Sequence, residues 1–384
     1  DGDGKLDIYV CNLESPNLLY RNLGNLAFEE CARRFGLDFT GACFYPAFAD
    51  YDNDGDLDVY LLNNRVFLQS LLPELLAKVE LPTSMTKTLR ELTPPMPSLV
   101  PDEHGKGLAV PPGYEDHLLE FGGRLFFAGQ ADRLLRNDGA RFSDVTREAG
   151  IADQGMGLSA TWWDHDGDGR LDLYVANDLE SPDVLYRNRG DGTFEDISAT
   201  ALPQLAYFGM GSDAADVDGD GRFDFCVADM AMRTHYAAKV LMGDMGDRGW
   251  FLENGRPPQV MRNALFMNTG TGRFLEVGQL AGVAKTDWTW TVKFGDLDAD
   301  GHVDLFATNG IPRFDNDPDA RARFSALWAA GKRDEAIALA ANLPAVPEKN
   351  LALRNDGLPP GEPPHFTDRA ADWGLDLEAV SQGA

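Results

Sequence analysis

The sequence predicts an all-β protein, a β-propeller of four-stranded blades with partly helical insertions. One observation behind this prediction is an acidic loop, D-x-D-x-D-G-x-x-D, which begins at Asp50 and recurs from Asp164, Asp216 and Asp296. Another is an apolar segment ending in Arg-Asn or a close variant, which follows each loop and continues through a glycine turn to a phenylalanine. Four short antiparallel strands per unit of about 50 residues form a propeller blade. A β-sandwich is the alternative, but it does not explain a loop that recurs at one place in every unit.

Each acidic loop leads into a short apolar run that ends in a polar residue, as in LYVAN at 173–177. Continuous β-rich runs of this kind are typical of strands covered on both faces. The third repeat holds the whole unit, with strands predicted near 159–163, at 171–177, at 183–188 and near 193–197. The sequence NRGDG within 188–192 is a strong hairpin signal, because its glycines accept a positive φ.

The repeats place the chain in a single propeller domain, residues 1–384. Their bounds are about 1–49, 50–163, 164–215, 216–295 and 296–384. The third repeat is the compact one, and the predicted insertions lie at about 65–131, 230–262 and 312–349. A helix is predicted at 71–79, and an amphipathic helical pattern runs across 321–343. Loops this long are uncommon unless functional, although lids packed over the propeller are the alternative.

The spacing of the carboxylates predicts a calcium site in each loop. Aspartates two residues apart in a glycine-containing turn all point inward and repel one another unless a cation lies between them. Hard oxygen ligands suit Ca²⁺, which accepts about 6–8 of them. The predicted ligands are the carboxylates at positions 1, 3, 5 and 9 and the backbone carbonyl at position 7, with the turn made by a glycine at position 6. They are Asp1, Asp3 and Asp7; Asp50, Asp52, Asp54, Asp56 and Asp58; Asp164, Asp166, Asp168, Arg170 and Asp172; Asp216, Asp218, Asp220, Arg222 and Asp224; and Asp296, Asp298, Asp300, His302 and Asp304.

This assignment gives about one Ca²⁺ per complete loop, four or five in all. The loops begin like EF-hands, but an EF-hand requires glutamate at position 12 and a helix after the loop. Position 12 instead holds Val10, Leu61, Val175, Val227 and Ala307. An ordinary Asx-turn without metal explains one such loop but hardly five. His165 and His302 lie at loop positions whose side chains are not ligands, and we expect both side chains to face solvent.

The first loop lacks one carboxylate, because Asp1 stands at its third position. We therefore expect this loop to bind calcium more weakly than the four complete ones, and the chain to be part of a longer propeller. The alternative is a closed five-bladed ring in which residues near 378–384 pair with the strand at 6–10. Such closure removes two exposed sheet edges, which otherwise invite aggregation.

The repeats resemble the VCBS/FG-GAP repeats of the ASPIC/UnbV (cartilage acidic protein-like) family. The matching motifs are the acidic loops, the Leu-Tyr-Arg-Asn segments, GMG at 209–211 and TDWTW at 286–290. The resemblance runs over nearly the whole chain and is least close in the insertions. It implies a propeller like the head of integrin α chains, usually with seven blades, with calcium in the loops and an extracellular location.

Charge and cysteine usage limit the partners. Asp and Glu number 62 against 34 Lys and Arg, a net charge of −28, which disfavours nucleic acid and anionic lipid because both are polyanions. No run of 18 apolar residues predicts a transmembrane segment. The 4 cysteines are too few for a disulfide scaffold. Cys11 and Cys226 lie in apolar runs and are expected to be buried, whereas Cys31 and Cys43 are close in sequence and form the candidate disulfide.

Two classes of function fit these features. In the first, a calcium-stiffened propeller presents its loops and insertions to an extracellular protein or glycan, as in adhesion. In the second, the insertions assemble the pocket of an extracellular hydrolase or lyase acting on carbohydrate or peptide. The first is favoured, and no enzyme is expected, because no Walker loop, H-E-x-x-H or G-x-S-x-G motif is present. A cluster of perturbed carboxylates in an insertion-lined pocket would favour the second.

The nearest approach to a catalytic or transition-metal site lies in the first insertion. His104 and His117 share it with Glu103, Glu115 and Asp116.

The expected compartment follows from the calcium affinity of the loops. Extracellular calcium modules bind with Kd values of about 10⁻⁴–10⁻³ M, so such loops would be empty in a cytosol at submicromolar calcium. We therefore expect a secreted, cell-surface or periplasmic protein.

Overall fold

The structure is a computed structural model that describes residues 2–64, 100–101, 108–109, 118–121, 124–151, 154–178, 181–241, 255, 257–314, 317–357 and 362–383. The predicted helix at 71–79, the cluster around His104 and His117, and the ligand Asp1 lie outside the described residues. The chain forms two compact units. One consists of residues 1–160 and 188–194, and the other of residues 161–187 and 195–384.

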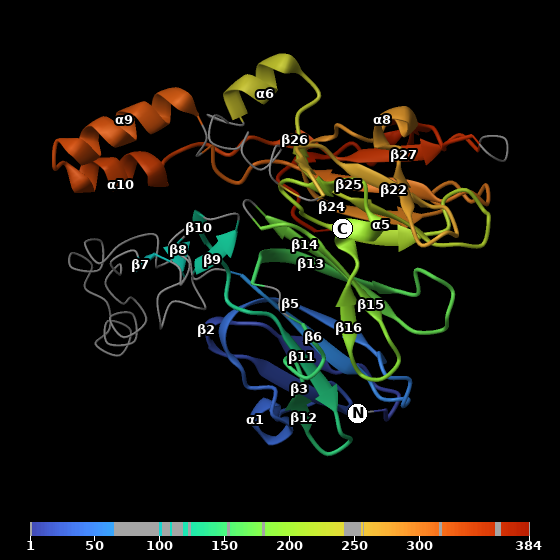
Figure 1. The fold of residues 1–384 in the computed structure, drawn as a ribbon. Helices are drawn as coiled ribbons and strands as arrows, with labels where there is room; N and C mark the ends of the chain where they lie inside the picture. The colour runs from blue at the N-terminus through green and yellow to red at the C-terminus, as the bar shows by residue number, and fades with distance from the viewer. Residues whose placement is uncertain are drawn as a thin grey trace. The chain divides into compact units, whose positions relative to one another are not determined.

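Five sheets carry the five repeats (Figure 1). Neighbouring strands such as β5 and β6, β14 and β15, and β19 and β22 run antiparallel. In chain order the sheets are β1 (Ile8–Val10), β3 (Leu18–Gly24) and β4 (Ala27–Glu30); β12 (Phe142–Asp144), β11 (Arg133–Asn137), β6 (Asp58–Asn63), β5 (Thr40–Ala49) and β2 (Leu13–Pro16); β13 (Met156–Trp163), β14 (Asp172–Asp178), β15 (Val184–Asn188) and β16 (Phe194–Asp196); β18 (Ser212–Ala215), β19 (Asp224–Val227), β22 (Ala264–Asn268) and β23 (Phe274–Glu276); and β20 (Met230–Ala231), β24 (Asp287–Gly295), β25 (Asp304–Asn309), β27 (Leu351–Asn355) and β28 (Phe366–Asp368).

The blade predicted from the third repeat is confirmed. Its four strands, β13 to β16, lie within a few residues of the predicted ranges and are ordered as they occur in the chain. In the second and third blades the second strand is almost fully buried: all six residues of β6 are buried, as are the first six of β14. This burial confirms that the apolar runs after these two loops form strands covered on both faces.

Consecutive blades also share strands. β2, which follows the second strand of the first blade, pairs with β5 in the sheet of the second blade, and β20, which follows the second strand of the fourth blade, pairs with β24 in the sheet of the fifth. In each case the segment that follows a blade's second strand extends the next blade's sheet. A single blade cannot bury both faces alone, and this exchange ties the first blade to the second and the fourth to the fifth through backbone hydrogen bonds.

The remaining elements are short or lie in the insertions. Four two-stranded sheets pair β7 (Val100–Pro101) with β8 (Leu108–Ala109), β9 (Leu118–Phe121) with β10 (Arg124–Phe127), β17 (Leu205–Ala206) with β21 (Gln259–Val260), and β26 (Glu348–Lys349) with β29 (Glu378–Ala379). The pairing of β29 with β26 differs from the alternative in which this segment pairs with residues 6–10. A seven-bladed ring stays a prediction.

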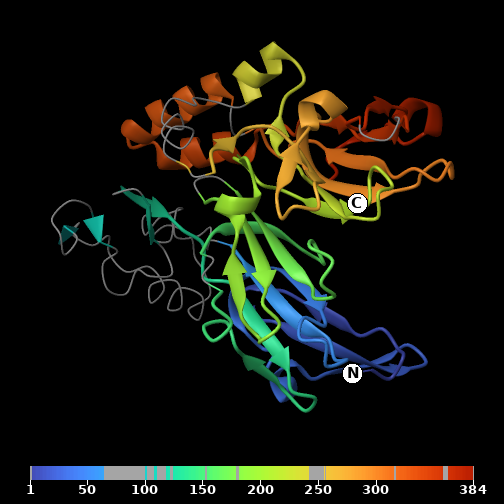
Figure 2. The same ribbon diagram turned by 45° about the vertical axis from the view of Figure 1, so that its right-hand side comes forward.

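The third insertion contains two helices where the sequence predicted one helical pattern across 321–343. Helices α9 (Pro318–Ala329) and α10 (Arg333–Ala341) lie side by side (Figures 1 and 2). Gly331, with φ 74°, separates them in a conformation that favours glycine. The second insertion contributes α6 (His235–Leu241).

One-turn helices recur after the last strand of four blades, a feature that the sequence reading missed. They are α1 (Ala32–Phe35), α5 (Ser198–Ala201), α8 (Gly278–Ala281) and α11 (Ala370–Trp373). A carboxylate two residues earlier accepts the first helical N–H, as Asp196 does from Ser198 at 2.9 Å and Asp368 from Ala370 at 3.0 Å. The signal was present, because an acidic residue stands two positions after each blade's final phenylalanine.

Candidate metal centre

The acidic loops share one backbone conformation. In each, positions 4 and 6 have a positive φ, which L-residues other than glycine and asparagine rarely adopt. At position 4 these residues are Gly2, Asn53, Gly167, Gly219 and Ala299, with φ from 60° to 76°, and at position 6 they are Gly4, Gly55, Gly169, Gly221 and Gly301, with φ from 79° to 94°. The turn predicted at the sixth position is therefore confirmed in all five loops.

The first aspartate of each complete loop holds this turn. Both carboxylate oxygens of Asp50 accept backbone N–H bonds, from Asp54 and Gly55, each at 3.0 Å. The same pair of bonds forms at the other three complete loops, to Asp164, Asp216 and Asp296. The loop thereby wraps around its first carboxylate, which places the carboxylates at positions 3 and 5 nearby.

The last aspartate of the loop is buried and anchors the loop to its blade. Asp58, Asp172, Asp224 and Asp304 are at most 1% exposed. Oδ2 of Asp224 accepts the backbone N–H of loop position 2, Val217, at 3.0 Å, and Oδ1 accepts that of Asn268 on the third strand at 2.7 Å. Asp58 and Asp304 make the equivalent pairs of bonds. The position-9 carboxylate is thus a structural residue as well as a predicted ligand.

The asparagine that closes the Leu-Tyr-Arg-Asn motif links neighbouring loops. Its side-chain amide donates to the carbonyl at position 2 of the preceding repeat's loop: Asn188 to Tyr51 at 2.8 Å, Asn268 to His165 at 2.7 Å, and Asn355 to Val217 at 3.0 Å. The sequence pattern alone predicted no role for this asparagine. Its recurrence at one motif position was the available signal.

Each complete loop brings three of its predicted carboxylates together. Ligand oxygens lie within 4.8 Å of one another in the sets Asp50, Asp52 and Asp58; Asp164, Asp166 and Asp168; Asp216, Asp218 and Asp224; and Asp296, Asp298 and Asp300. The remaining predicted carboxylates, Asp54, Asp172, Asp220 and Asp304, are not members of these oxygen-only sets. Three hard oxygen donors in a turn fit Ca²⁺. The predicted carbonyl ligands of Asp56, Arg170, Arg222 and His302 follow directly after the left-handed glycine.

In two loops the carboxylates are protonated more readily than usual. Burial raises the pKa of Asp58 to about 6 and that of Asp224 to about 7. Burial, aided by the neighbouring Asp54, also raises the pKa of Asp52, and burial with Asp216 does the same for Asp218. A cation among these groups would relieve both the desolvation and the repulsion.

In the first, third and fifth loops, basic side chains lie against the carboxylates. Arg354 donates from Nε to Asp298 at 2.9 Å and from a terminal nitrogen to Asp300 at 2.8 Å. Arg187 pairs with Asp166 at 3.1 Å. In the first loop, Lys5 pairs with Asp3 at 2.7 Å, while Asp7 accepts the Asn22 N–H at 2.8 Å. The arginine that precedes the asparagine of the Leu-Tyr-Arg-Asn motif therefore offsets part of the negative charge of the loop in the third and fifth repeats.

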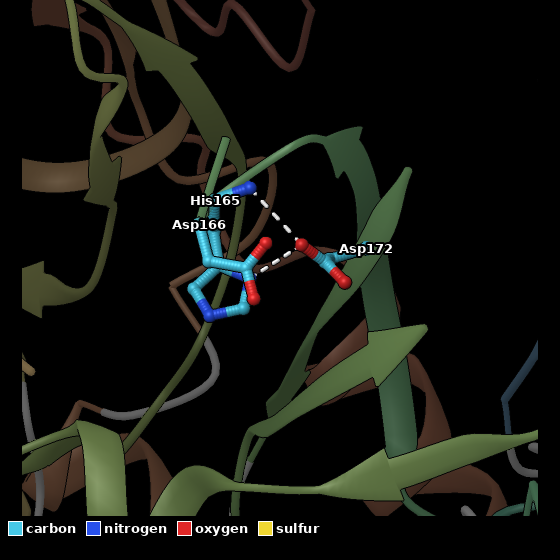
Figure 3. Close-up of side chains that lie close together, drawn as sticks. All are labelled: His165, Asp166 and Asp172. Atoms are coloured by element: carbon cyan, nitrogen blue, oxygen red, sulfur yellow. Dashed lines mark hydrogen bonds and ion pairs between the residues drawn. The ribbon is translucent and has the colours of Figure 1, made fainter. Parts of the chain in front are cut away.

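The expectation that His165 faces solvent is wrong. Its side chain is buried, at 5% exposure, and its ring stacks on Phe274 with centroids 6.2 Å apart. Both its backbone N–H and its Nδ1 contact Oδ2 of Asp172 (Figure 3). The other complete loops hold Tyr51, Val217 and Leu297 at this position. Tyr51 and Val217 are buried as His165 is, whereas Leu297 is 42% exposed although its backbone binds Asp304 in the same way. His302, at position 7, is exposed as expected.

A cavity of about 210 Å³ opens beside the third loop. Its lining comes from residues 164–167, residues 221–223 of the next loop, and the turn at Asn268, Gly270 and Gly272. This volume is below the about 300–1,000 Å³ of ordinary small-molecule sites. The cavity therefore suits an ion and its water ligands better than a larger ligand.

Four-stranded sheets with an acidic turn between their first and second strands define the blades of a β-propeller. Comparison with known families agrees, since the model for FG-GAP-like repeats matches residues 1–61, 164–227 and 253–307. These three segments are therefore similar to FG-GAP-like repeats.

Other comparisons add little. Among solved structures, one similar chain comes from work on specific recognition of non-reducing terminal N-acetylglucosamine by an Agrocybe aegerita lectin. The two chains are 15% identical over 98% of this chain and 81% of that one, with a TM-score of 0.32. No curated protein matches the sequence. Among the described residues, no helix is long and apolar enough to cross a membrane.

Proposed function

We propose that this chain is a calcium-binding extracellular propeller that acts as a binding or adhesion module for a protein or a glycan. The observation that carries the proposal is the fourfold recurrence of three carboxylates gathered within 4.8 Å in one loop conformation. Such a cluster is costly without a cation, because burial and mutual repulsion both disfavour the charged form.

The contacts of the loop residues explain how calcium would stiffen the protein. Bound Ca²⁺ supplies the positive charge that lets several carboxylates stay ionised together. The first aspartate holds the turn, the last aspartate holds the third strand, and the asparagine of the following repeat holds position 2. An ordered loop thereby also restrains the next blade, for example through the hydrogen bond from the Asn268 amide to the His165 carbonyl. A rigid set of loops presents a preorganised surface, which lowers the entropic cost of binding a partner.

Calcium titration of the full chain tests the metal part of the proposal. We expect about four equivalents of Ca²⁺ by calorimetry and a higher melting temperature in calcium than in EDTA. Asp168→Ala should remove one equivalent, whereas the matched control Asp319→Ala, at an exposed position in α9, should remove none. Equal melting temperatures in calcium and EDTA would contradict the proposal.

The partner and the location are tested separately. The calcium affinities that we expect, about 10⁻⁴–10⁻³ M, suit extracellular concentrations. A glycan array and a pull-down with purified extracellular proteins, each run with calcium and with EDTA, should reveal calcium-dependent binding. The narrower relation to the ASPIC/UnbV family belongs to the same proposal. Two of the motifs that resemble this family, GMG at 209–211 and TDWTW at 286–290, contact each other, because the Gly211 N–H donates to the Trp290 carbonyl at 2.8 Å.

One cluster favours the second candidate, an extracellular enzyme. Burial raises the pKa of Glu348 to about 7, and Coulomb repulsion from Asp287 adds to the shift. Asp287 has φ 75° and is paired with Arg233, while the Trp288 N–H donates to Glu348 at 3.1 Å. A strained residue beside a carboxyl that titrates near neutrality is typical of functional sites. Arg233 and Glu348 both come from predicted insertions.

Chromogenic glycosides and peptides test this candidate. Hydrolysis that depends on a group of pKa about 7 and is lost in Glu348→Gln, but kept in Glu335→Gln on exposed α10, would support an enzyme. Hydrolysis that is equal in all three proteins would contradict it.

A further inference from the structure

Two cysteine thiols from neighbouring blades meet in the first unit. The sulfur atoms of Cys11 and Cys43 lie 2.6 Å apart. Cys11 follows β1 and precedes β2, and Cys43 lies in β5. Leu13 of β2 pairs with both Gly41 and Ala42 of β5 at a bulge, and this antiparallel pairing brings Cys11, two residues before Leu13, close to Cys43. The approach is thus fixed by strand pairing.

The surroundings hold the pair in place. Cys43 is buried at 6% exposure and Cys11 is half-buried. Both lie in an apolar cluster with residues such as Val59, Leu61 and Leu135. Well-packed side chains have few alternative rotamers, so neither thiol can readily turn away from the other.

The disulfide considered from sequence, Cys31 with Cys43, is not the pair that the structure brings together. The Cys31 thiol instead lies 3.6 Å from the carbonyl oxygen of Leu19, to which it donates. Cys226 is fully buried in β19. Proximity in sequence misled here, because the strand register decides which sulfur atoms meet.

We propose that Cys11 and Cys43 are a site of disulfide formation that covalently joins the first blade to the second. The oxidant required is a disulfide such as glutathione disulfide. One cysteine thiolate attacks a sulfur of the oxidant, forms a mixed disulfide and releases one glutathione thiolate. The other cysteine thiolate then attacks the protein sulfur and releases the second glutathione. Two thiols lose two electrons and two protons, and one glutathione disulfide becomes two glutathione molecules.

The reactivity of the pair agrees with the geometry. The hydrogen bond with Cys11 lowers the pKa of the Cys43 thiol, and Asn17 contributes in the same direction. The same contact and burial raise the pKa of Cys11. A thiolate at Cys43 is the better nucleophile, so one partner is prepared to react while the other stays protonated until the second step.

The test uses the full chain, reduced and then incubated with or without glutathione disulfide in EDTA. Free thiols are blocked with N-ethylmaleimide after unfolding, and the protein is digested without reductant for mass spectrometry. We expect two of the 4 cysteines to escape blocking after oxidation, and a peptide containing Cys11 to be joined to one containing Cys43. Subsequent reduction should release the two peptides.

Variants separate this pair from the other cysteines. Cys31→Ser should leave the cross-link unchanged, whereas Cys11→Ser and Cys43→Ser should each abolish it. Cys11 is half-buried, so Cys11→Ser keeps the test valid even where Cys43→Ser fails to fold. Blocking of all four cysteines, a cross-link through Cys31 or Cys226, or a mixed disulfide with glutathione alone would overturn the proposal. None of these outcomes depends on calcium binding.

Discussion

The second and fifth acidic loops show how one motif can carry two different charge arrangements. Arg136 and Arg354 occupy the same place in the repeat, immediately before the asparagine that ends the Leu-Tyr-Arg-Asn motif or its variant. Arg136 pairs with Asp138, at 2.9 Å, and among the described residues no arginine pairs with Asp52 or Asp54. Arg354 instead reaches across the loop to Asp298 and Asp300.

The electrostatic consequences are opposite. In the second loop, burial raises the pKa of Asp52 and of Asp58. In the fifth loop, the backbone N–H of His302 and the guanidinium of Arg354 hold the pKa of Asp300 below its usual value. A loop whose carboxylates lack a cationic partner gains most from a bound ion. We therefore expect calcium to bind the second loop more tightly than the fifth.

The largest effect should come from removing the first aspartate of each loop. Asp50→Ala loses two backbone hydrogen bonds and a calcium site, and should lower the free energy of unfolding by about 2–3 kcal/mol in calcium. At about 2 mM calcium and a Kd of about 10⁻⁴ M, the calcium contribution alone is about 1.8 kcal/mol. Asp296→Ala should show a smaller difference between calcium and EDTA. Chemical unfolding in both conditions measures this, and a larger calcium-dependent loss for Asp296→Ala would reverse the comparison.

The pH dependence of stability in the absence of calcium should reveal the protonation of Asp58, the buried aspartate of the second loop. The pKa of Asp58 is about 6 in the folded protein and 3.8 in its reference state. The folded state therefore binds the proton more tightly, and its contribution to stability is full below pH 3.8 and lost as pH rises through 6. We expect a loss of about 1–3 kcal/mol over this range in EDTA. Unfolding at several pH values should give a flatter profile for Asp58→Asn.

A second buried carboxylate adds to the same slope and needs a control. Asp229 is fully buried, and burial raises its pKa to about 8. Its Oδ1 has no hydrogen-bond partner, and the other repeats hold Asn12, Asn63, Asn177 and Asn309 at this position. Asp229→Asn should reduce the slope between pH 6 and pH 8, to which Asp224 and Glu348, each with a pKa of about 7, also contribute, and should leave the part due to Asp58. A profile that is unchanged in both variants would show that neither group governs it.

A moderate effect is expected from the arginine itself. Arg354→Ala frees Asp298 and Asp300, and should tighten calcium binding at one site by roughly two- to fivefold, in keeping with the small worth of exposed ion pairs. Arg136→Ala is the matched control, because that arginine pairs outside its loop. Calorimetric titration distinguishes the two. Weaker binding in Arg354→Ala would mean that the arginine positions the carboxylates for calcium.

The smallest effect concerns the backbone at position 4. Ala299 and Asn53 both have φ 60°, but alanine tolerates this conformation less well than asparagine. Ala299→Gly should raise the free energy of unfolding by about 0.5–1 kcal/mol, after the entropy of glycine in the unfolded chain is allowed for. Asn53→Gly should be nearly neutral. Thermal unfolding of the two variants would contradict this account if Asn53→Gly were the more stabilising.

Features that depend on spacing along the chain can be predicted from the sequence alone. The period of the repeats, the four strands of a blade and the glycine at loop position 6 follow from local patterns of apolar, acidic and glycine residues. The closeness of the carboxylates at positions 1 and 3, which belong to all four sets, follows in the same way, because carboxylates two residues apart in one turn cannot lie far from each other. These features are local, so their physical cause is contained in a window of about ten residues.

Only the tertiary structure decided which distant residues meet. His165 is buried against Phe274. Arg354 pairs with Asp300 of its own loop, whereas Arg136 pairs with Asp138 outside its loop. Asn268 donates to His165 of the preceding repeat. The tertiary structure also sets Cys43 against Cys11 and not against Cys31. Each of these contacts depends on strand register and blade packing, in which a shift of one residue would change every partner. Identical motif positions therefore acquire different neighbours, and no pattern along the chain specifies them.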